Sequence, residues 1–486
     1  MIPLLWMLMS PAALAQNVDV GGYLRVGARP DLQGGDGRLG YWNLYGRLLN
    51  EGPYAVIDMR AQPLPRRPDS LEPWTSLHMR IEGGSTASAE PGGDSLASLR
   101  LSQLYALAGN VWLRDVTWKI GSLEYWYGDL GLYDMRPAHL LGDTMGLSAT
   151  WERPALDLLI GVGDSGYGIH GSEYHAVITA ASAARVRISR HLELGLGGQL
   201  NYEPKTEGNR LAPHVTPNVD MEDYIRGEVV ERYFAEDPDG LLDFPDPVAT
   251  DAQSYRAVAY LGFGGFGPLV WNHSFASLSG LHPELRSTEL YQGESTTLYT
   301  TELTDERTVL LVGNELQLRL IPSRLELAWG LLYGDHSDGD NAIAPSDHAR
   351  RYASTVLRTQ LYLRPTIHWL MEGSLAHEFS KNGNQWREHA DSIFENTGGL
   401  ADTRGLEMGD TDTRITVQAK GGLVLSPQGV GIYSRPSLRL LYGVQHSNMN
   451  NAYGNSFVED LDQYNQFGNV ERHWHHVIAL ETEAWF

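Results

Sequence analysis

The sequence predicts an all-β protein: a transmembrane antiparallel β-barrel of about 18 strands with long extracellular loops. Three observations lead to this prediction. Segments of alternating polarity recur along the chain, connections of unequal length separate them, and both ends of the chain alternate in the same way. With 486 residues and a mean hydropathy of −0.30, the chain is too polar for a helical membrane protein and too long for one simple soluble β domain.

The last segment, residues 474–486, shows the alternation most clearly. Ile478, Leu480 and Phe486 fall on one face, whereas Glu481 and Glu483 fall on the other. A half-buried strand of a soluble protein would alternate too. The segment also has the roughly 9–11 residues that a tilted membrane strand needs, and it ends on an aromatic residue, which favours the closing strand of a barrel.

Residues 18–27 alternate in the same way, so the two ends of the chain can pair and close the ring. Between them, similar segments predict roughly 16–20 strands in total, and bacterial barrels take even numbers. These segments are residues 41–50, 54–61, 76–82, 99–108, 111–122, 145–151, 156–162, 184–190, 193–202, 255–263, 269–278, 308–320, 324–333, 352–363, 366–379, 411–423 and 432–445.

The first residues predict export. Residues 1–15 are almost wholly apolar and end in a small-x-small motif, which indicates a signal peptide followed by one barrel domain over residues 16–486. The missing Lys or Arg near the start departs from that pattern. A retained anchor would need about 20 apolar residues.

The connections alternate between short and long. Tight turns are predicted at residues 109–110, 321–323 and 426–429, and long loops at 204–251, 279–307, 334–351, 381–410 and 447–472. Residues 204–251 contain 12 acidic and 4 basic residues, with a short helix expected at 221–236. Such a loop is either a solvated surface or a lid over the pore.

Charge and residue types exclude several functions. A net charge of −23 argues against nucleic acid as a partner, and the absence of cysteine excludes disulfides and thiolate chemistry. No phosphate-binding loop or nucleophile elbow is present, so no catalytic residue and no cofactor is assigned. The histidines at 473, 475 and 476 lie on a strand, and the aspartates at 335, 338 and 340 lack the spacing of a calcium loop, so no metal site is assigned either.

Five short motifs occur in order along the chain: VDVGGYLR at residues 18–25, RLG at 38–40, GSLEY at 121–125 with Asp129 and Asp134 following, SRPSLR at 434–439 and EAWF at 483–486. Together they resemble the maltoporin family of carbohydrate-specific outer-membrane porins. Membership would imply an 18-stranded trimeric barrel whose lumenal aromatic side chains guide maltodextrins.

The resemblance also implies roles for individual residues. The aromatic track would comprise Tyr23, Tyr433 and Trp485, with Tyr45 one residue out of register, and the polar track Arg25 and Arg38. The inward third loop would contain the acids Asp129 and Asp134. Here the sequence departs from the family. Arg136 stands near the position at which the family has the tyrosine that narrows its pore, and Tyr127 replaces a basic residue of the family. The sugar therefore stays open.

Strand parity bears on the same aromatic residues without the family. Tyr23 shares its face with Arg25, and Trp485 shares its face with Glu483. Read as part of a strand, Tyr433 shares its face with Arg435 and Arg439, opposite Ile432 and Leu438. All three rings are therefore expected in the lumen, where Arg435, Arg439 and Glu483 extend the polar track. Alternatively, the rings only fill space. Trp118 and Trp369 side with apolar residues and are expected to face lipid.

The sequence thus favours a non-enzymatic channel for facilitated diffusion of sugars. The expected substrates are maltodextrins or other oligosaccharides, which would pass along a lumenal aromatic track flanked by charged residues. Alternatives are a polysaccharide export porin, a general diffusion porin, and a barrel adhesin or receptor. The expected partners are an oligosaccharide substrate, outer-membrane lipid and two further copies in a homotrimer. The expected location is the outer membrane of a Gram-negative bacterium.

Overall fold

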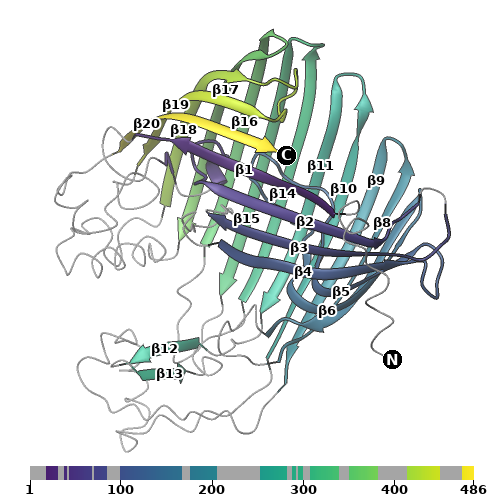
Figure 1. Ribbon diagram of the computed structural model, residues 1–486. Coiled ribbons are helices and arrows are strands. Elements are labelled where there is room, and N and C mark those ends of the chain that lie inside the picture. The colour runs from purple at the N-terminus through teal and green to yellow at the C-terminus, as the bar shows by residue number, and fades with distance from the viewer. Residues whose placement is uncertain are drawn as a thin grey trace, which may run out of the picture.

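A computed structural model of the chain describes residues 18–30, 38–40, 43–67, 70–84, 99–166, 176–204, 252–281, 287–291, 294–298, 307–338, 350–380, 413–448 and 473–486. Its main feature is a sheet of 18 antiparallel strands that closes on itself (Figure 1). Each strand of this sheet pairs with the next one along the chain, and β1 pairs with β20 to complete the ring. The predicted fold is confirmed.

The barrel strands are β1 (Val18–Ala28), β2 (Tyr54–Leu64), β3 (Trp74–Gly84), β4 (Leu99–Gly109), β5 (Val116–Tyr125), β6 (Leu140–Glu152), β7 (Leu156–Asp164), β8 (Ile178–Ser189), β9 (Leu192–Glu203), β10 (Ala252–Phe266), β11 (Leu269–Leu281), β14 (Arg307–Ile321), β15 (Leu325–Asp338), β16 (Arg350–Arg364), β17 (Ile367–Ser380), β18 (Thr413–Leu425), β19 (Ser437–Ser447) and β20 (Trp474–Trp485). A separate hairpin consists of β12 (Ser287–Tyr291) and β13 (Glu294–Leu298).

Every barrel strand overlaps a predicted segment, and one predicted strand is wrong. Residues 43–50 of the segment 41–50 form a 3-10 helix, η1 (Asn43–Tyr45), followed by turns with positive φ at Gly46 and Leu49. The apolar residues of this segment give a strand-like pattern in the sequence because they pack against the barrel wall. Leu39 and Leu49, for example, form one buried cluster with Leu441 of β19.

The outer face of the barrel is apolar. Ile120, Ile160 and Leu196 are each more than 60% exposed, and the residues that alternate with them are polar or covered. A closed ring leaves no open edge of the sheet, which is the condition under which β-strands can cross a membrane. An even-numbered barrel with this outer face sits in the outer membrane of a Gram-negative bacterium, as predicted. No helix among the described residues is long and apolar enough to cross a membrane.

Short connections gather at one end of the barrel and long ones at the other. The short end, called the turn side, includes residues 190–191, 322–324 and 365–366. The long end is called the loop side. In such barrels the turns face the periplasm. Two predicted turns are longer than expected: residues 110–115, so that β5 begins at Val116, and residues 426–436, so that β19 begins at Ser437.

Several predictions fall outside the described residues. These are the signal peptide at 1–15, the helix at 221–236 and the possible lid at 204–251. They stay predictions.

Candidate functional site: the lining of the lumen

Two loops fold into the barrel and cover part of its inner wall. Loop 3 is the connection of residues 126–139 between β5 and β6. Its Tyr127, Leu130, Leu132 and Tyr133 are at most 2% exposed. The backbone N–H of Leu132 donates a 2.8 Å hydrogen bond to Oε2 of Glu315 in β14, which ties the middle of the loop to the wall.

Glycines in the wall provide the space that loop 3 occupies. A Cβ atom at Gly195 of β9 would lie 2.5 Å from the ring of Tyr127, and one at Gly330 of β15 would lie 2.6 Å from the ring of Tyr133. Both distances are shorter than any normal contact between carbon atoms. Loop 3 therefore lies directly on the strand backbone at these two points.

Loop 1, residues 29–53, covers the next part of the wall. The Tyr45 hydroxyl donates to Oε2 of Glu378 in β17 at 2.6 Å. Lys420 of β18 donates at 2.9 Å both to the Tyr45 carbonyl oxygen and to Oε1 of Glu372. The N–H of Arg47 donates to the carbonyl oxygen of Leu132 at 2.8 Å, so loops 1 and 3 are joined.

The inner wall therefore has two halves. On β14 to β18 the inward charges lie beneath the loops, as with Glu315, Glu372 and Arg414, all at most 3% exposed. On β2 to β5 they remain open to the lumen, as with Asp58 and Arg80, whose side chains are 45% and 31% exposed. We call these the covered half and the open half. Solutes can reach the charges of the open half, whereas those of the covered half are closed off by the loops.

Aromatic rings lie at the border of the open half, where β2, β1 and β20 are neighbours. The ring centroids of Tyr54 and Tyr23 lie 6.0 Å apart, and those of Tyr23 and Trp485 lie 4.7 Å apart. Tyr23 is 6% exposed and its hydroxyl donates to Glu483 at 2.6 Å, whereas Trp485 is 60% exposed. The pairing of Tyr23 with Trp485 across the seam of the barrel sets their spacing.

Charged groups surround this aromatic row. Glu483 binds three guanidinium groups, those of Arg47 at 3.1 Å, Arg435 at 2.6 Å and Arg439. Since one carboxylate serves three cations, the side chains are held in fixed positions by charge-assisted hydrogen bonds.

A second buried acid, Glu51 of loop 1, completes this network. It pairs with Arg25, and it accepts from Arg47 at 3.2 Å and from Asn43 at 3.0 Å. Burial raises the pKa of Glu51 to about 7, and the two arginines oppose this rise without cancelling it. Glu51 is therefore a group of the lumen that titrates near neutral pH.

Loop 3 presents charged side chains to the lumen. Asp129, Asp134 and Arg136 have side chains that are 44–54% exposed. The Arg136 guanidinium lies 4.2 Å from the ring centroid of Trp126. Tyr127, by contrast, turns toward the wall. Loop 3 thus lies inside the barrel, and its role as the constriction stays a prediction.

Two candidates of the aromatic track lie differently from the expectation. Tyr45 is fully buried between loop 1 and the wall, so its ring cannot meet a solute. Tyr433 lies inside the barrel, but the parity argument for it is wrong because residues 426–436 form a turn rather than a strand. Ile432, expected on the opposite face, is also inside, at 6% exposure.

Tyr433 belongs to a second aromatic group. Its hydroxyl donates to Oε1 of Glu315 at 2.6 Å, and its ring lies nearly parallel to that of Trp271 at 6.4 Å. A Cβ atom at Gly131 of loop 3 would lie 3.4 Å from the Tyr433 ring. Turn residues 426–436 thus reach up to loop 3. Arg38, the remaining track candidate, lies in loop 1, where its carbonyl oxygen is 3.1 Å from Nε2 of His475.

Sequence reasoning missed Tyr54, Arg47 and Glu51. Tyr54 shares strand parity with Asp58, so the alternation of polar and apolar residues already places Tyr54 on the lumenal face. Arg47 and Glu51 are four residues apart, a helical or turn spacing, but the apolar pattern of residues 41–50 predicts a strand.

The histidines near the terminus do not converge. His475 is buried in the lumen, whereas His476 on the outer face lies 2.7 Å from the Tyr442 hydroxyl. No group of three potential metal ligands occurs among the described residues. Of the aspartates weighed as a calcium loop, Asp335 pairs with Arg351 at 3.1 Å, and Asp340 lies outside the described residues.

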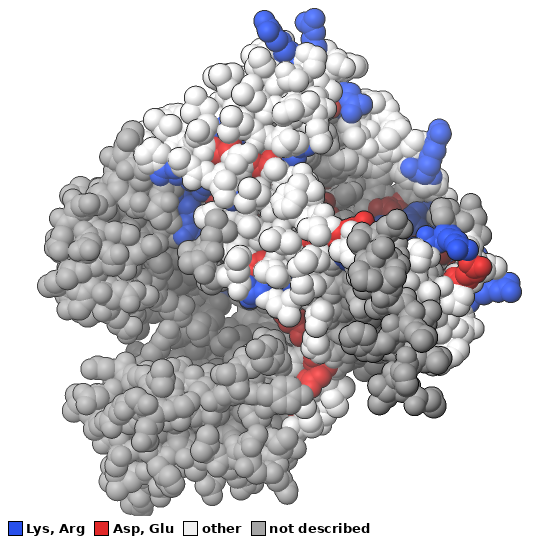
Figure 2. Space-filling view, in the orientation of Figure 1, with Lys and Arg blue, Asp and Glu red and all other residues white. Residues whose placement is uncertain are grey.

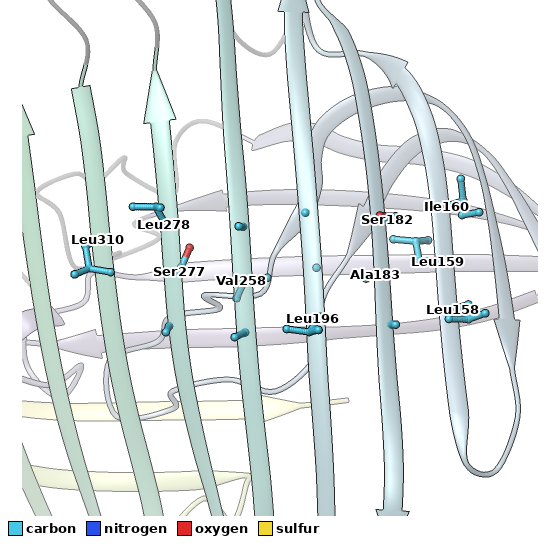
Figure 3. A pocket seen from close by; sticks show the side chains of 16 residues that line it. Leu158, Leu159, Ile160, Ser182, Ala183, Leu196, Val258, Ser277, Leu278 and Leu310 are labelled. Atoms are coloured by element: carbon cyan, nitrogen blue, oxygen red, sulfur yellow. The ribbon is translucent and has the colours of Figure 1, made fainter.

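The outer wall contains one hollow of about 630 Å³ across β7 to β11 and β14 (Figure 3). Its exposed rim residues include Ile160, Leu196 and Leu278, which share the outward parity. The hollow therefore faces lipid and is not part of the lumen.

No protein-family model matches the sequence, and no curated protein matches it. Solved structures with a similar fold include OmpT of Vibrio cholerae, at 9% identity over 96% of this chain and 97% of that chain, with a TM-score of 0.41. OprD of Pseudomonas aeruginosa matches at 9% identity over 97% and 95%, with a TM-score of 0.41. OmpF of Salmonella typhi, in complex with daunomycin, matches at 9% identity over 97% and 98%, with a TM-score of 0.40. These likenesses do not select a family, and the resemblance to maltoporins stays a prediction.

Proposed function

We propose that this protein is a passive channel through which sugars, such as maltodextrins or other oligosaccharides, diffuse across the outer membrane. The observation that supports it best is the row of Tyr54, Tyr23 and Trp485 at the border of the open half. Rings in a wet lumen suit pyranoses, which offer a C–H face to an aromatic surface and hydroxyls to charged groups.

The three rings of this row differ in how much of their surface is exposed to the lumen. Trp485 and Tyr54 have ring surface that a solute can reach, whereas Tyr23 is largely buried and holds Trp485 in place. Arg435 and Arg439 beside the rings would bind hydroxyl groups with their partly exposed guanidinium groups, and the buried Glu483 would hold them in position. If each ring contact contributes about 1 kcal/mol, binding is weak and repeated, as conduction requires.

Loop 3 would act as the constriction. Its exposed Asp129, Asp134 and Arg136 have 44–54% of their side chains open to the lumen. A solute would pass between this charged surface and the aromatic row. The proposal includes no catalytic step and no cofactor.

The test is the block of single-channel current in planar bilayers by maltodextrins of increasing length. Trp485→Ala should weaken sugar block about fivefold, the equivalent of one lost ring contact. Trp369→Ala is the matched control, because Trp369 lies on the outer face at 42% exposure. Equal permeation of sugars and non-sugars of the same size in liposome swelling would refute selectivity and leave a general diffusion porin.

The trimer implied by the maltoporin resemblance belongs to the same proposal. Native mass spectrometry of the detergent-extracted protein gives the number of chains directly. A monomeric mass would remove the trimer from the proposal without affecting the sugar test, which reads each pore separately.

A further inference from the structure

The turn side of the barrel carries a set of exposed arginines. We call it the arginine collar; it comprises Arg66, Arg67, Arg114, Arg153, Arg190, Arg324 and Arg364. In Figure 2 basic side chains project from the rim at the end of the barrel where the short turns lie. The described residues of these turns include two acids, Glu72 and Asp115, and an exposed third acid, Glu152, ends the adjoining strand β6. The rim is therefore cationic, although the whole chain has a net charge of −23.

The collar is not explained by ion pairing within the rim. Arg67 pairs with Glu72 at 3.1 Å, and Arg153 pairs with Asp115 at 2.8 Å. Within the described part of the chain, Arg114, Arg324 and Arg364 have no such acidic partner. All seven cations are arginine. Arginine binds phosphate in a bidentate manner and is the less strongly hydrated of the two basic side chains.

One turn of this rim also exposes apolar side chains. In turn 2, residues 110–115, Trp112 is 91% exposed and Leu113 is 56% exposed. Trp112 has a φ of 63°, a conformation that a bulky residue rarely adopts. Strain of this kind persists only where surrounding contacts impose it.

Those contacts are present in turn 2. Asn110 Nδ2 donates to the carbonyl oxygens of Ser70 and Glu72 at 3.4 and 3.3 Å, and its Oδ1 accepts from the N–H of Asp115 at 3.0 Å. The Trp118 indole N–H donates to the carbonyl oxygen of Val111 at 3.1 Å. The tip is thus held rigidly with its tryptophan outward.

The tip continues the lipid-facing surface of the barrel. Trp112 meets Trp118 edge to face at 6.1 Å, and Trp118 shares its face with Ile120, which is 61% exposed. On the neighbouring strand the Arg153 guanidinium lies 5.5 Å from the ring of Trp151. Amphipathic aromatic rings next to cations are the arrangement expected at the depth of lipid head groups.

We propose that the turn side binds phospholipids with anionic head groups in the periplasmic leaflet. In this arrangement Trp112 and Leu113 insert at the membrane interface and the arginine collar binds the head-group phosphates. Positive charge near a membrane surface attracts anionic lipid, and each arginine contributes roughly a fivefold gain in binding. The proposal does not depend on what passes through the lumen.

Native mass spectrometry tests it with the whole protein, titrated with phosphatidylglycerol or with phosphatidylcholine of the same acyl chains. The triple variant Arg114→Gln, Arg324→Gln and Arg364→Gln should lose at least tenfold in phosphatidylglycerol binding and little in phosphatidylcholine binding. Arg100→Gln is the matched control, since Arg100 is 73% exposed but lies at the loop-side end of β4. Retained heat-modifiable gel mobility verifies that each variant is folded.

A second measurement tests the insertion of Trp112 and Leu113 into the membrane interface, which we call the anchor. Brominated phosphatidylglycerol in vesicles should quench wild-type tryptophan fluorescence more than that of Trp112→Ala. Equal binding of the two lipids by the wild type, or an unchanged triple variant, would overturn the proposed collar. Equal quenching with and without Trp112 would overturn the anchor.

Discussion

The covered and open halves of the wall have the same alternation of polar and apolar residues but differ in what their charges do. In the covered half Glu372 lies between Lys420 at 2.9 Å and Arg358 at 2.6 Å, and all three are at most 4% exposed. In the open half Asp58 and Arg80 form a comparable pair at 2.7 Å with 45% and 31% of their side chains exposed. The first group supports the loops, whereas the second faces the solution that fills the lumen.

The difference teaches that inward parity alone does not identify a solute-binding residue. The covered half uses its charges to bind loop backbone, as Lys420 does with the Tyr45 carbonyl oxygen. A charge removed from water must be matched locally, because its burial costs several kcal/mol. A half-exposed pair is screened and contributes at most about 1 kcal/mol.

Glu372→Gln should have the largest effect, because it leaves two buried cations with no anion between them. We expect a loss of about 3–5 kcal/mol in unfolding free energy, measured by urea denaturation in detergent. Asp58→Asn is the matched control in the open half and should cost at most about 1 kcal/mol. Similar losses for both variants would show that the two halves do not differ energetically.

The strands of the wall could be predicted from the sequence, whereas the loops that cover one half of it could not. A barrel of roughly 16–20 strands and the inward faces of those strands follow from a period of two that holds on any strand with lipid on one side, whereas the exact number of 18 does not. The position of the loops does not, because Leu39, Leu44 and Leu49 look like strand residues until the wall that buries them is known. The resemblance alone assigns Tyr45 to the aromatic track, and it contains nothing about the burial of Tyr45 between loop 1 and the wall.

In the aromatic row the face of each residue could be predicted, but the contact between the rings could not. Tyr23 and Trp485 could be assigned to one face from parity, but their 4.7 Å contact depends on pairing between the first and last strands. Pairing across more than 450 residues is set by closure of the whole ring. No local pattern contains that information.

Gly330→Val should have the next largest effect, since a side chain here would overlap the buried ring of Tyr133. Overpacking of this kind typically costs about 1–3 kcal/mol, and the mobile partner is loop 3 rather than the strand. We expect loop 3 to leave the wall and the single-channel conductance to change. Gly373→Ala is the control, because a Cβ atom there has no neighbour within 4 Å. Unchanged conductance in Gly330→Val would mean that loop 3 does not set the width of the pore.

The smallest expected effect concerns Glu51, where loop 1 meets the open half. Its pKa is raised to about 7, so folding favours the protonated form. Its stabilising contribution is complete below the ordinary glutamate pKa and is lost as the pH rises through about 7. Below that value Arg25 and Arg47 lack one compensating charge, so anions should pass more readily relative to cations. The reversal potential in a salt gradient should therefore shift with a midpoint near pH 7, and Glu51→Gln should abolish the shift. If the midpoint remained in Glu51→Gln, the titrating group would have to be sought among the exposed residues of the open half rather than in the loop that borders it.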